Sequence, residues 1–549
     1  MRSYMRSCFA RILILVLTPP AIDGSKPRDT YSQLFVSDSS EFTQEEAKVN
    51  GSLPEYLNGK YIHNGCGSFE FNNRSFSHTF DCYGKLHMWE FTDGNVVFSS
   101  RMLTSNFYNE SARRNIVFPE VFFGVESPRF DLKERMEAIM NSKPGPKGAD
   151  NMNVNLWDFG FEDDTILALT DSFNYLKINT NTLQATPFVF DNMDFSENGS
   201  MSPAHPQRVP DGSGSTISCV LKTTNMMTNN GRITLFRQEK GATQLQSFFT
   251  TEVPIAHYVH SFSITENYVV VALYPTYMRE MCVTGSLRNN WRGVEECFTW
   301  DGKLNKTTLL VVSHKTGEQV TTSDVPPFFS FHHINAYEDS KGQIVVDLIS
   351  NIDSSIIQSE VFASKTMLDW EARDAFKKEY SPSTYTRITI DHGTEESQMQ
   401  EVSILGTDGR KYHFDFPIVN PKVAARKHCF VYGIAGPFAG DSKSYNATAI
   451  VKVDLCSKAS NTSVDVAPTE LYFPPANQVS TGDFSFVPNP ASDAAEDDGV
   501  LLGVWINGNA RGASYLRVLD AKTLKELATV ETPGAHFHMP FGFHGQWFG

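Results

Sequence analysis

The sequence lacks any dense cluster of lysine and arginine, and acidic residues outnumber basic residues by 63 to 47 in a chain of 549 residues. The net charge is −16 and the isoelectric point lies near 5.4. A nucleic-acid-binding protein needs a basic face that neutralises phosphates. The charge balance therefore argues against nucleic acid as a partner.

Long apolar runs and closely spaced cysteines are also missing. Outside the N-terminus, no apolar run approaches the ~18 residues of a transmembrane helix. The eight cysteines contain no CxxC motif, which argues against both a thiolate metal site and a disulfide framework. Cys282 and Cys297 form the one close pair, and their spacing would allow them to close a loop.

The N-terminus has the pattern of a secretory signal peptide. Three arginines precede a short apolar run at 12–17, and two prolines follow at 19 and 20. We predict a signal peptide at 1–24 and a single domain at 25–549. Asn-X-Ser/Thr sequons follow at Asn50, Asn73, Asn109, Asn198, Asn305, Asn446 and Asn461. Together these features favour a glycoprotein of the secretory pathway or the extracellular space. The alternative is a cytoplasmic protein held peripherally at a membrane.

Short stretches of β-branched and aromatic residues fill the chain from about residue 85 onward, separated by Gly, Asn, Asp and Ser. Only 130–141 and 364–380 have the apolar spacing of helices. No low-complexity linker divides the chain. The pattern predicts an all-β fold, and a β-propeller closes many strands while leaving few edges. A pair of stacked β-domains is the alternative.

Four of the fifteen histidines share an unusual setting, at strand ends among aromatic residues and Gly or Pro. They are His205 in SPAHPQ, His260 in YVHSFSITENY, His332 in FSFHHIN and His544 in PFGFHG. Imidazole is the commonest metal ligand in proteins, so four such residues brought together by a closed fold would form a metal site. Successive side chains on a strand point to opposite faces, so only one of His332 and His333 can reach that site. Periodicity leaves open which one does.

Eight motifs run in order along nearly the whole chain: VNGSLPEYLNGKYIHNGCG, HTFDCYGKLHMWEF, ADNMNVNLWDFG, AHP, YVHSFSITENY, FHHINAYED, EDDGVLL and PFGFHG. They resemble the carotenoid cleavage oxygenase family, which includes β-carotene dioxygenases and the retinoid isomerase of the retinal pigment epithelium. The resemblance implies a seven-bladed β-propeller with Fe(II) on its axis, held by four catalytic histidines that fall on His205, His260, His332 and His544. It also implies that His333 faces away from the metal.

In the resembled family, three ligand histidines each donate their second ring N–H to a glutamate, which fixes the orientation of the ring. The matching positions here are all aspartates, which would orient His260, His332 and His544 in turn: Asp171, Asp415 and Asp483. Each side chain is shorter by one C–C bond of about 1.5 Å. We therefore expect either an inward shift of the backbone or bridging water. Thr170, beside Asp171, is a candidate for contact with the substrate.

Other positions depart from the family pattern. His63 and Cys66 replace the arginine and proline of the opening motif, and the family's PDPCK-type motif is absent. Region 277–298 is polar, where relatives carry an apolar segment that dips into the membrane. The run IVFPEVFFG at 116–124 is left as the candidate for weak contact with a membrane surface.

The resemblance implies a non-haem Fe(II) dioxygenase that cleaves a conjugated C=C bond of a carotenoid or apocarotenoid with O2 and yields aldehyde or ketone products. The 41 phenylalanines would then line a dry tunnel, besides filling the core. Two alternatives remain within the same fold: a retinoid isomerohydrolase, and a secreted carotenoid- or lipid-binding protein without turnover.

Overall fold

The structure is a computed structural model. It describes residues 30–141, 150–192, 200–285, 293–301, 306–358, 362–377, 383–405, 411–437, 449–457, 466–475, 477–508, 514–534 and 537–549. Most of these residues lie in antiparallel sheets, as the sequence predicted. The predicted signal peptide lies outside the described residues, and so do the sequons at Asn198, Asn305, Asn446 and Asn461.

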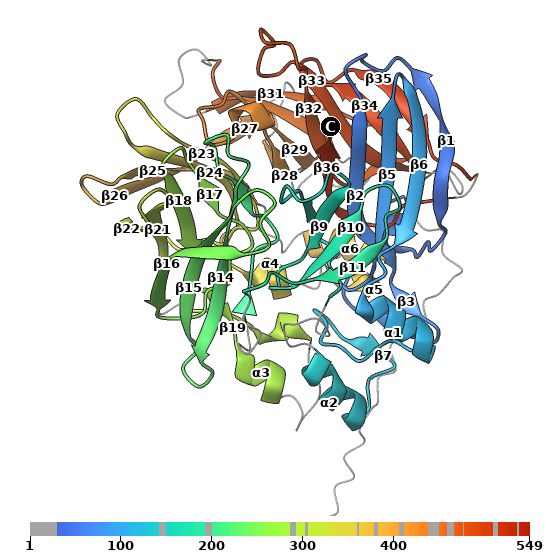
Figure 1. Ribbon diagram of the computed structural model, residues 1–549, viewed down its shortest axis with the longest axis horizontal. Helices are drawn as coiled ribbons and strands as arrows, with labels where there is room; N and C mark the ends of the chain where they lie inside the picture. Colours follow the sequence, from blue (N-terminus) through green and yellow to red (C-terminus); the bar gives the residue numbers. More distant parts are fainter. Residues whose placement is uncertain are drawn as a thin grey trace, which may run out of the picture.

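The N-terminal and C-terminal strands meet in one nine-stranded sheet, at the upper right of Figure 1. Within it the first strand pairs with β35, and the last strand pairs with β2. The order is β32 (Gln478–Pro488), β33 (Gly499–Asn507), β34 (Ser514–Asp520), β35 (Glu526–Glu531), β1 (Phe42–Gly51), β6 (Asn95–Met102), β5 (Tyr83–Thr92), β2 (Gly59–Ser68) and β36 (Gly542–Phe548). This pairing ties the two ends of the fold together.

Five smaller sheets follow one another along the chain. The first two contain β8 (Asn155–Trp157), β9 (Thr165–Leu169), β10 (Tyr175–Asn179) and β11 (Ala185–Phe188); then β12 (Ser200–Met201), β13 (Gln207–Arg208), β14 (Thr216–Asn225), β15 (Asn230–Gln238) and β16 (Leu245–Val253). The next two contain β17 (Ser263–Ile264), β18 (Tyr268–Leu273), β21 (Thr307–Ser313) and β22 (Gln319–Val325); then β23 (His333–Glu338), β24 (Ile344–Ser350), β25 (Thr384–Asp391) and β26 (Glu396–Glu401). The last contains β27 (Ser403–Leu405), β28 (Tyr412–Ile418), β29 (Phe430–Pro437), β30 (Ala449–Asp454) and β31 (Val466–Tyr472).

Apolar clusters join most of the neighbouring sheets. One cluster packs β14 and β15 against β18 and β21, a second packs β18 and β21 against β23–β25, and a third packs β24 and β25 against β28–β30. Further clusters pack β29 and β30 against β32–β34, and β2 and β5 against β8–β10. Inner strands such as β9 and β24 are therefore buried on both faces, whereas the outer β26 is largely exposed. Trp157 of β8 donates to the Thr216 hydroxyl of β14 at 3.0 Å, which links the first two small sheets. The sheets therefore form a ring rather than the alternative of two stacked β-domains.

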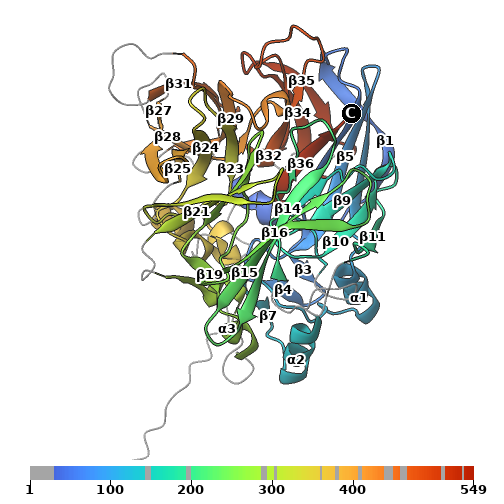
Figure 2. The same cartoon turned by 60° about the vertical axis from the view of Figure 1, so that its left-hand side comes forward.

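Short helices and small hairpins gather at one end of the ring, the lower end in Figures 1 and 2. The small sheets pair β3 (Glu70–Phe71), β4 (Arg74–Phe76) and β7 (Glu126–Ser127), and β19 (Thr276–Met278) with β20 (Phe298–Trp300). The helices are α1 (Asn106–Arg114), α2 (Leu132–Asn141), α3 (Glu280–Gly285), α4 (Ser355–Gln358), α5 (Ser364–Met367) and α6 (Trp370–Lys377).

The helix predicted at 130–141 is confirmed as α2, and a capping box explains where it starts. The Asp131 carboxylate accepts from the Glu134 backbone N–H at 2.8 Å, and Glu134 accepts from the Asp131 N–H at 2.9 Å. The single helix predicted at 364–380 is wrong, because the segment forms α5 and α6. Asp369 lies between them and caps α6 by accepting from the backbone N–H of Glu371 at 2.9 Å.

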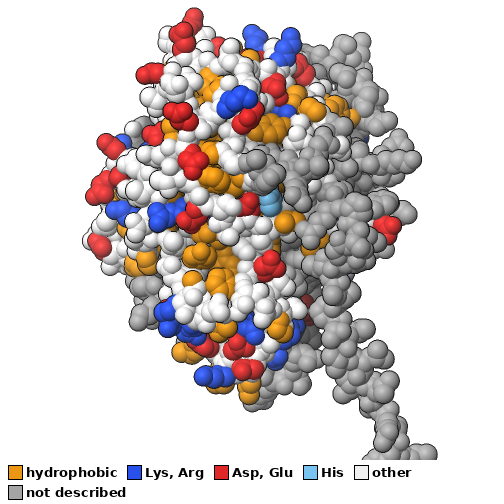
Figure 3. Space-filling model, turned by 90° about the vertical axis from the view of Figure 1, so that its right-hand side faces the viewer, with side chains coloured by type: hydrophobic (Ala, Val, Ile, Leu, Met, Phe, Trp, Pro, Cys, Tyr) orange, Lys and Arg blue, Asp and Glu red, His pale blue; other side chains and the backbone are white. Residues whose placement is uncertain are grey.

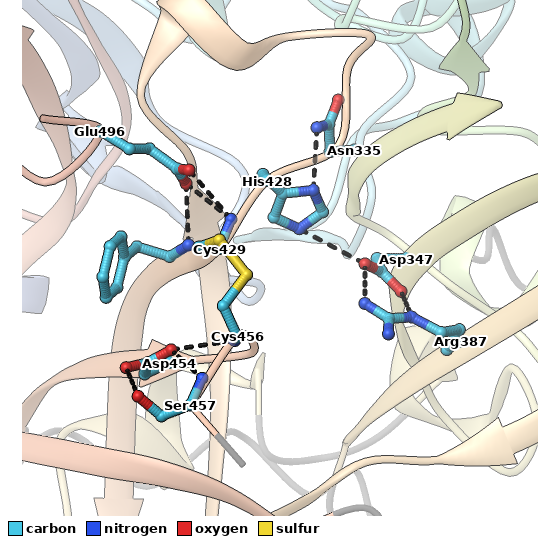
Figure 4. Close-up of a disulfide and its surroundings, with 10 residues drawn as sticks. Asn335, Asp347, Arg387, His428, Cys429, Asp454, Cys456, Ser457 and Glu496 are labelled. Atoms are coloured by element: carbon cyan, nitrogen blue, oxygen red, sulfur yellow. Dashed lines mark hydrogen bonds and ion pairs between the residues drawn. A yellow bond between two sulfur atoms is a disulfide. The ribbon is translucent and has the colours of Figure 1, made fainter. Parts of the chain in front are cut away.

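The expectation that the cysteines form no disulfide framework is wrong. The structure contains the expected Cys282–Cys297 pair and also Cys66–Cys82 and Cys429–Cys456, while Cys219 is free and buried. The Cys429–Cys456 pair joins residues 27 apart at a Cα separation of 5.1 Å (Figure 4). The carboxylate of Glu496 accepts from the backbone N–H of Cys429 and holds this turn in place. Strand pairing brings these cysteines together, and sequence spacing carries no such signal.

The apolar run at 116–124 is not an exposed membrane anchor. Val117, Phe118 and Phe122 are at most 7% exposed and pack into a cluster with α1. Within the run, Ile116 is 38% exposed, but the apolar side chains that reach furthest into solvent here belong to α2: Leu132, Met136 and Met140 are 56–63% exposed. Among the described residues, no helix is long and apolar enough to cross a membrane. On the face in Figure 3, acidic and basic side chains are interspersed.

Candidate metal centre

Four imidazoles converge where the inner ends of different sheets meet. His205 follows β12, His260 precedes β17, His332 immediately precedes β23, and His544 lies in β36. One ring nitrogen from each lies within 4.8 Å of the corresponding nitrogens of the other three. The rings also pack edge to face, with centroids of His205 and His544 4.5 Å apart. Residues separated by 55, 72 and 212 positions in the chain therefore form one cluster.

The spacing fits a single metal ion. With metal–nitrogen distances of about 2.1 Å, ligands at right angles lie about 3.0 Å apart and opposite ligands about 4.2 Å apart. The Nε2 atoms of His205 and His260 are 3.1 Å apart. Because the four ring nitrogens all lie within 4.8 Å of one another, they can surround one ion and leave further coordination positions open.

Each of the three aspartates contacts one of these rings directly. Nδ1–H of His260 donates to Asp171 at 2.7 Å, that of His332 to Asp415 at 2.6 Å, and that of His544 to Asp483 at 2.7 Å: three pairs in the predicted combination. No bridging water is needed, so the backbone makes up the missing methylene. Each bond places the ring proton on Nδ1 and leaves Nε2 as the electron-pair donor.

The position of the rings also controls their charge. Burial lowers the pKa of His205 and of His544 well below the ordinary value, and the neighbouring imidazoles lower it further. The neutral imidazole is the form that binds a metal ion. At neutral pH these two rings are therefore ready to act as ligands.

The carboxyls of the cluster have contrasting environments. Burial alone would raise the pKa of Asp415, but His332 and the backbone N–H of Phe416 outweigh it, so the pKa lies below its usual value. Burial raises the pKa of Asp483 to about 7, partly offset by a nearby imidazole and the backbone N–H of Gly545. A cation among the four rings would favour the charged form of both carboxyls.

The histidine doublet separates into two environments. His332 turns toward the cluster, while His333 points into the adjoining sheet. Its Nδ1 lies 2.6 Å from the Ser263 hydroxyl, and its Nε2 lies 2.9 Å from the Tyr274 hydroxyl. Both nitrogens of His333 are therefore engaged away from the metal centre.

Tyr258 is a member of the site that the sequence prediction missed. Its hydroxyl donates to the same Asp171 oxygen that receives His260, at 2.7 Å. The other Asp171 oxygen accepts from the Ala204 backbone N–H at 3.0 Å, beside His205. The sequence signal for Tyr258 was its place two residues before His260, in the same motif YVHSFSITENY. Thr170 is half-buried next to Asp171, and no contact described places it in the site.

The departures in the opening motif lie beside the centre. In β2, Asn64 is directly opposite His544 of β36, and Cys66 forms its disulfide two residues further on. His63 is fully buried, and a Cβ added to Gly542 would come within 1.8 Å of its ring. These residues thus brace the strand that carries His544.

A cavity of 330 Å³ opens onto the cluster and is lined by three of the four histidines. Its walls mix polar and aromatic side chains, including Gln207, Ser261, Phe416 and Phe486. The Phe416 ring lies 5.3 Å from that of His332, centroid to centroid. Cavities of about 300–1,000 Å³ commonly hold small organic ligands.

Comparison with known proteins decides the family. The family model described as retinal pigment epithelial membrane protein matches residues 35–549. The chain belongs to the carotenoid cleavage oxygenase family. Among its relatives, the mitochondrial carotenoid-cleaving dioxygenase of Macaca fascicularis is 28% identical, covering 91% of both chains. The carotenoid isomerooxygenase of Galleria mellonella is 27% identical, covering 92% of this chain and 93% of the relative.

Solved structures of this family share the fold. A variant of the Synechocystis apocarotenoid oxygenase superposes with a TM-score of 0.75 at 22% identity, covering 95% of this chain and 99% of the other. The cobalt-substituted form of that oxygenase gives 0.74 at 22% identity, covering 94% and 98%. The ring of sheets is therefore a β-propeller.

Proposed function

We propose that this protein is a non-haem Fe(II) dioxygenase that cleaves one conjugated C=C bond of a carotenoid or apocarotenoid with O2. The observation that carries the proposal is the convergence of His205, His260, His332 and His544, three of them oriented by carboxylates. Carotenoid cleavage is the activity named for the mitochondrial relatives. We count the nine-stranded sheet as two blades, which together with the five smaller sheets makes seven blades around the axis.

In this proposal the four imidazoles hold Fe(II), and the metal supplies a site at which O2 and the double bond can react. Asp171, Asp415 and Asp483 would keep the Nε2 atoms of His260, His332 and His544 available to the ion. An apolar polyene has no group that ligates a metal, so aromatic walls must position it by shape. Phe331, 5.3 Å from the ring of His260, and Phe416 supply such walls and exclude water.

The test is turnover of the iron-loaded protein with a β-apocarotenal under ¹⁸O2. We expect bleaching of the polyene and ¹⁸O in the new carbonyl groups, since both oxygen atoms of O2 go to the two products. His332→Ala should abolish bleaching and bound iron. His392→Ala, at a surface turn next to Tyr268, is the matched control and should preserve both.

Two outcomes would support the alternatives instead. Conversion of a retinyl ester to an unlabelled alcohol would indicate an isomerohydrolase. Stoichiometric iron with tight polyene binding but no bleaching of several polyenes would indicate a binding protein without turnover.

We also propose that the protein matures in the secretory pathway. Three disulfides form readily in that oxidising compartment and are rare in the cytosol. The sequons at Asn50, Asn73 and Asn109 are exposed and accessible to glycosylation. Expression in a eukaryotic secretion system should yield a glycosylated protein whose mass falls on treatment with an N-glycosidase. Retention of the unmodified, uncleaved chain in the cytosol would contradict this.

Weak contact with a membrane surface is proposed through α2 in place of the run at 116–124. Leu132, Met136 and Met140 are four residues apart and form one exposed apolar stripe. Flotation with neutral vesicles should therefore recover the wild type, and Met136→Glu with Met140→Glu should reduce recovery severalfold. Equal recovery of both proteins would contradict the proposed contact.

A further inference from the structure

His78 is a buried imidazole outside the metal centre whose protonated nitrogen is fixed by a backbone contact. It lies in the segment between β4 and β5 and is 4% exposed. The backbone N–H of Phe80 donates to Nδ1 of His78 at 3.1 Å, so Nδ1 carries no proton. Burial lowers the pKa of His78 to about 3, so the ring is neutral. The remaining proton therefore lies on Nε2, as a hydrogen-bond donor.

That donor has no hydrogen-bond partner. Nε2 of His78 is buried and unbonded. Leaving a buried polar group unpaired is unfavourable by about 1–3 kcal/mol, so each such group in a folded protein calls for an explanation. His63 and His87 are also buried without partners. The ring of His63 is packed directly against Gly542 and leaves no room there, and the ring of His87 contacts Phe537, 5.8 Å away between centroids, rather than a group of three rings.

The surroundings of His78 are different, because they are aromatic and partly open. Its ring centroid lies 4.9 Å from that of Phe80, 5.0 Å from Phe123 and 5.9 Å from Phe362. We call these three residues the Phe cage. All three residues are only partly buried, so part of their surface borders open space. The cage thus combines an apolar wall with a single hydrogen-bond donor.

The backbone holds the cage in a fixed shape. The carboxyl group of Asp81 accepts from the N–H groups of Phe123 and Gly124, at 2.8 and 2.7 Å. The N–H of Thr79 donates to the carbonyl of Phe362 at 2.8 Å. A Cβ on Gly124 would come within 2.6 Å of the His78 side chain, so only glycine allows this approach. The donor is therefore preorganised before any ligand arrives.

The cage also lies near the metal centre. The Phe80 ring lies 5.5 Å from that of Phe543, the residue immediately before His544. The ring contacts of the cage therefore end one residue from a proposed iron ligand. A rigid polyene with its reacting bond at the metal can place one end among these rings.

We propose that Nε2–H of His78 donates a hydrogen bond to the oxygen at one end of the substrate, so that the protein selects a polyene carrying a terminal carbonyl group over a pure hydrocarbon. The substrate class is then an apocarotenoid aldehyde or ketone. This inference rests on the proposed function and narrows its substrate. His78 acts in specificity and takes no part in the bond cleavage.

The test is binding to the iron-loaded protein under argon, which prevents turnover. The probes are β-apo-8′-carotenal and the same polyene ending in a methyl group. We expect the aldehyde to bind about three- to tenfold more tightly, as one net hydrogen bond allows. We also expect its absorption band to shift to longer wavelength, because hydrogen bonding polarises the conjugated carbonyl. His78→Phe should remove both the preference and the shift while still binding the hydrocarbon, and His78→Gln, which keeps a donor, should recover part of both.

Equal affinity of the wild type for the two probes would overturn the proposal without any variant. Unchanged preference and shift in a folded His78→Phe protein would overturn it as well. These results differ from failure of the proposed function, in which the wild type binds neither polyene. Turnover need not be observed for any of these measurements.

Discussion

Replacing Asp171 by asparagine should weaken iron binding at the metal centre, because Asp171 holds more than one part of it. Its oxygens accept from Nδ1–H of His260, from the Tyr258 hydroxyl and from the Ala204 backbone N–H. Asparagine has the same shape and can keep the bond to Ala204. Its amide NH2 then faces Nδ1–H of His260, donor against donor.

His260 can relieve that clash only by moving its proton to Nε2, the atom aimed at the metal, or by turning its ring. Either change spoils one of four ligands. Loss of an orienting group of this kind typically lowers metal affinity by 10–100-fold. That corresponds to about 1.4–2.7 kcal/mol of binding free energy.

Tyr258→Phe is the matched control, because it removes one bond to Asp171 and leaves the Asp171–His260 bond. We expect it to cost about 1.5–3 kcal/mol of folding free energy, as a hydrogen bond to a charged group does. Iron affinity should change less than in Asp171→Asn. The assay is competition for Fe(II) against a coloured chelator under argon, with denaturant unfolding of the same samples. Iron affinity of Asp171→Asn within threefold of the wild type would refute the argument, as would an equal loss in Tyr258→Phe.

Three further predictions concern the rest of the chain. His332→Ala should lose bound iron, whereas His333→Ala, which breaks contacts inside the sheet, should lower the unfolding temperature and retain iron. Elemental analysis measures the iron and calorimetry the unfolding temperature. Loss of iron in both variants would contradict the assignment of His332 alone as a ligand. Burial raises the pKa of Asp81 to about 7, so the folded protein holds a proton there that the unfolded chain releases above about pH 4. The free energy of unfolding should then fall between pH 4 and 7, by up to about 1.4 kcal/mol per pH unit, and Asp81→Asn should flatten that slope in denaturant titrations. Opening the Cys429–Cys456 loop by paired alanine substitution should lower the free energy of unfolding by roughly 3–4 kcal/mol, and an unchanged denaturation midpoint would count against that disulfide.

Local sequence patterns predicted much of the fold and of the candidate site. β-branched runs separated by turn residues predicted the strands, and apolar spacing predicted α2. The sequence setting of His332 and of three other histidines marked them as a set. The resemblance to a family then assigned partners to Asp415 and the other aspartates. These features depend on short stretches of chain, in which side-chain period and residue type act directly.

Contacts between distant segments decided the remaining features. Cys429 and Cys456 meet only because neighbouring strands bring them together, and the break between α5 and α6 depends on how Asp369 caps one turn in the packed chain. The direct bond from Asp415 to His332 depends on how closely two strands approach, since the missing methylene is recovered by the backbone. The unpaired nitrogen of His78 exists only once three rings from separate segments surround it. The sequence determines which groups are available for bonding. Small differences in the separation of remote backbone segments determine which of those groups form bonds.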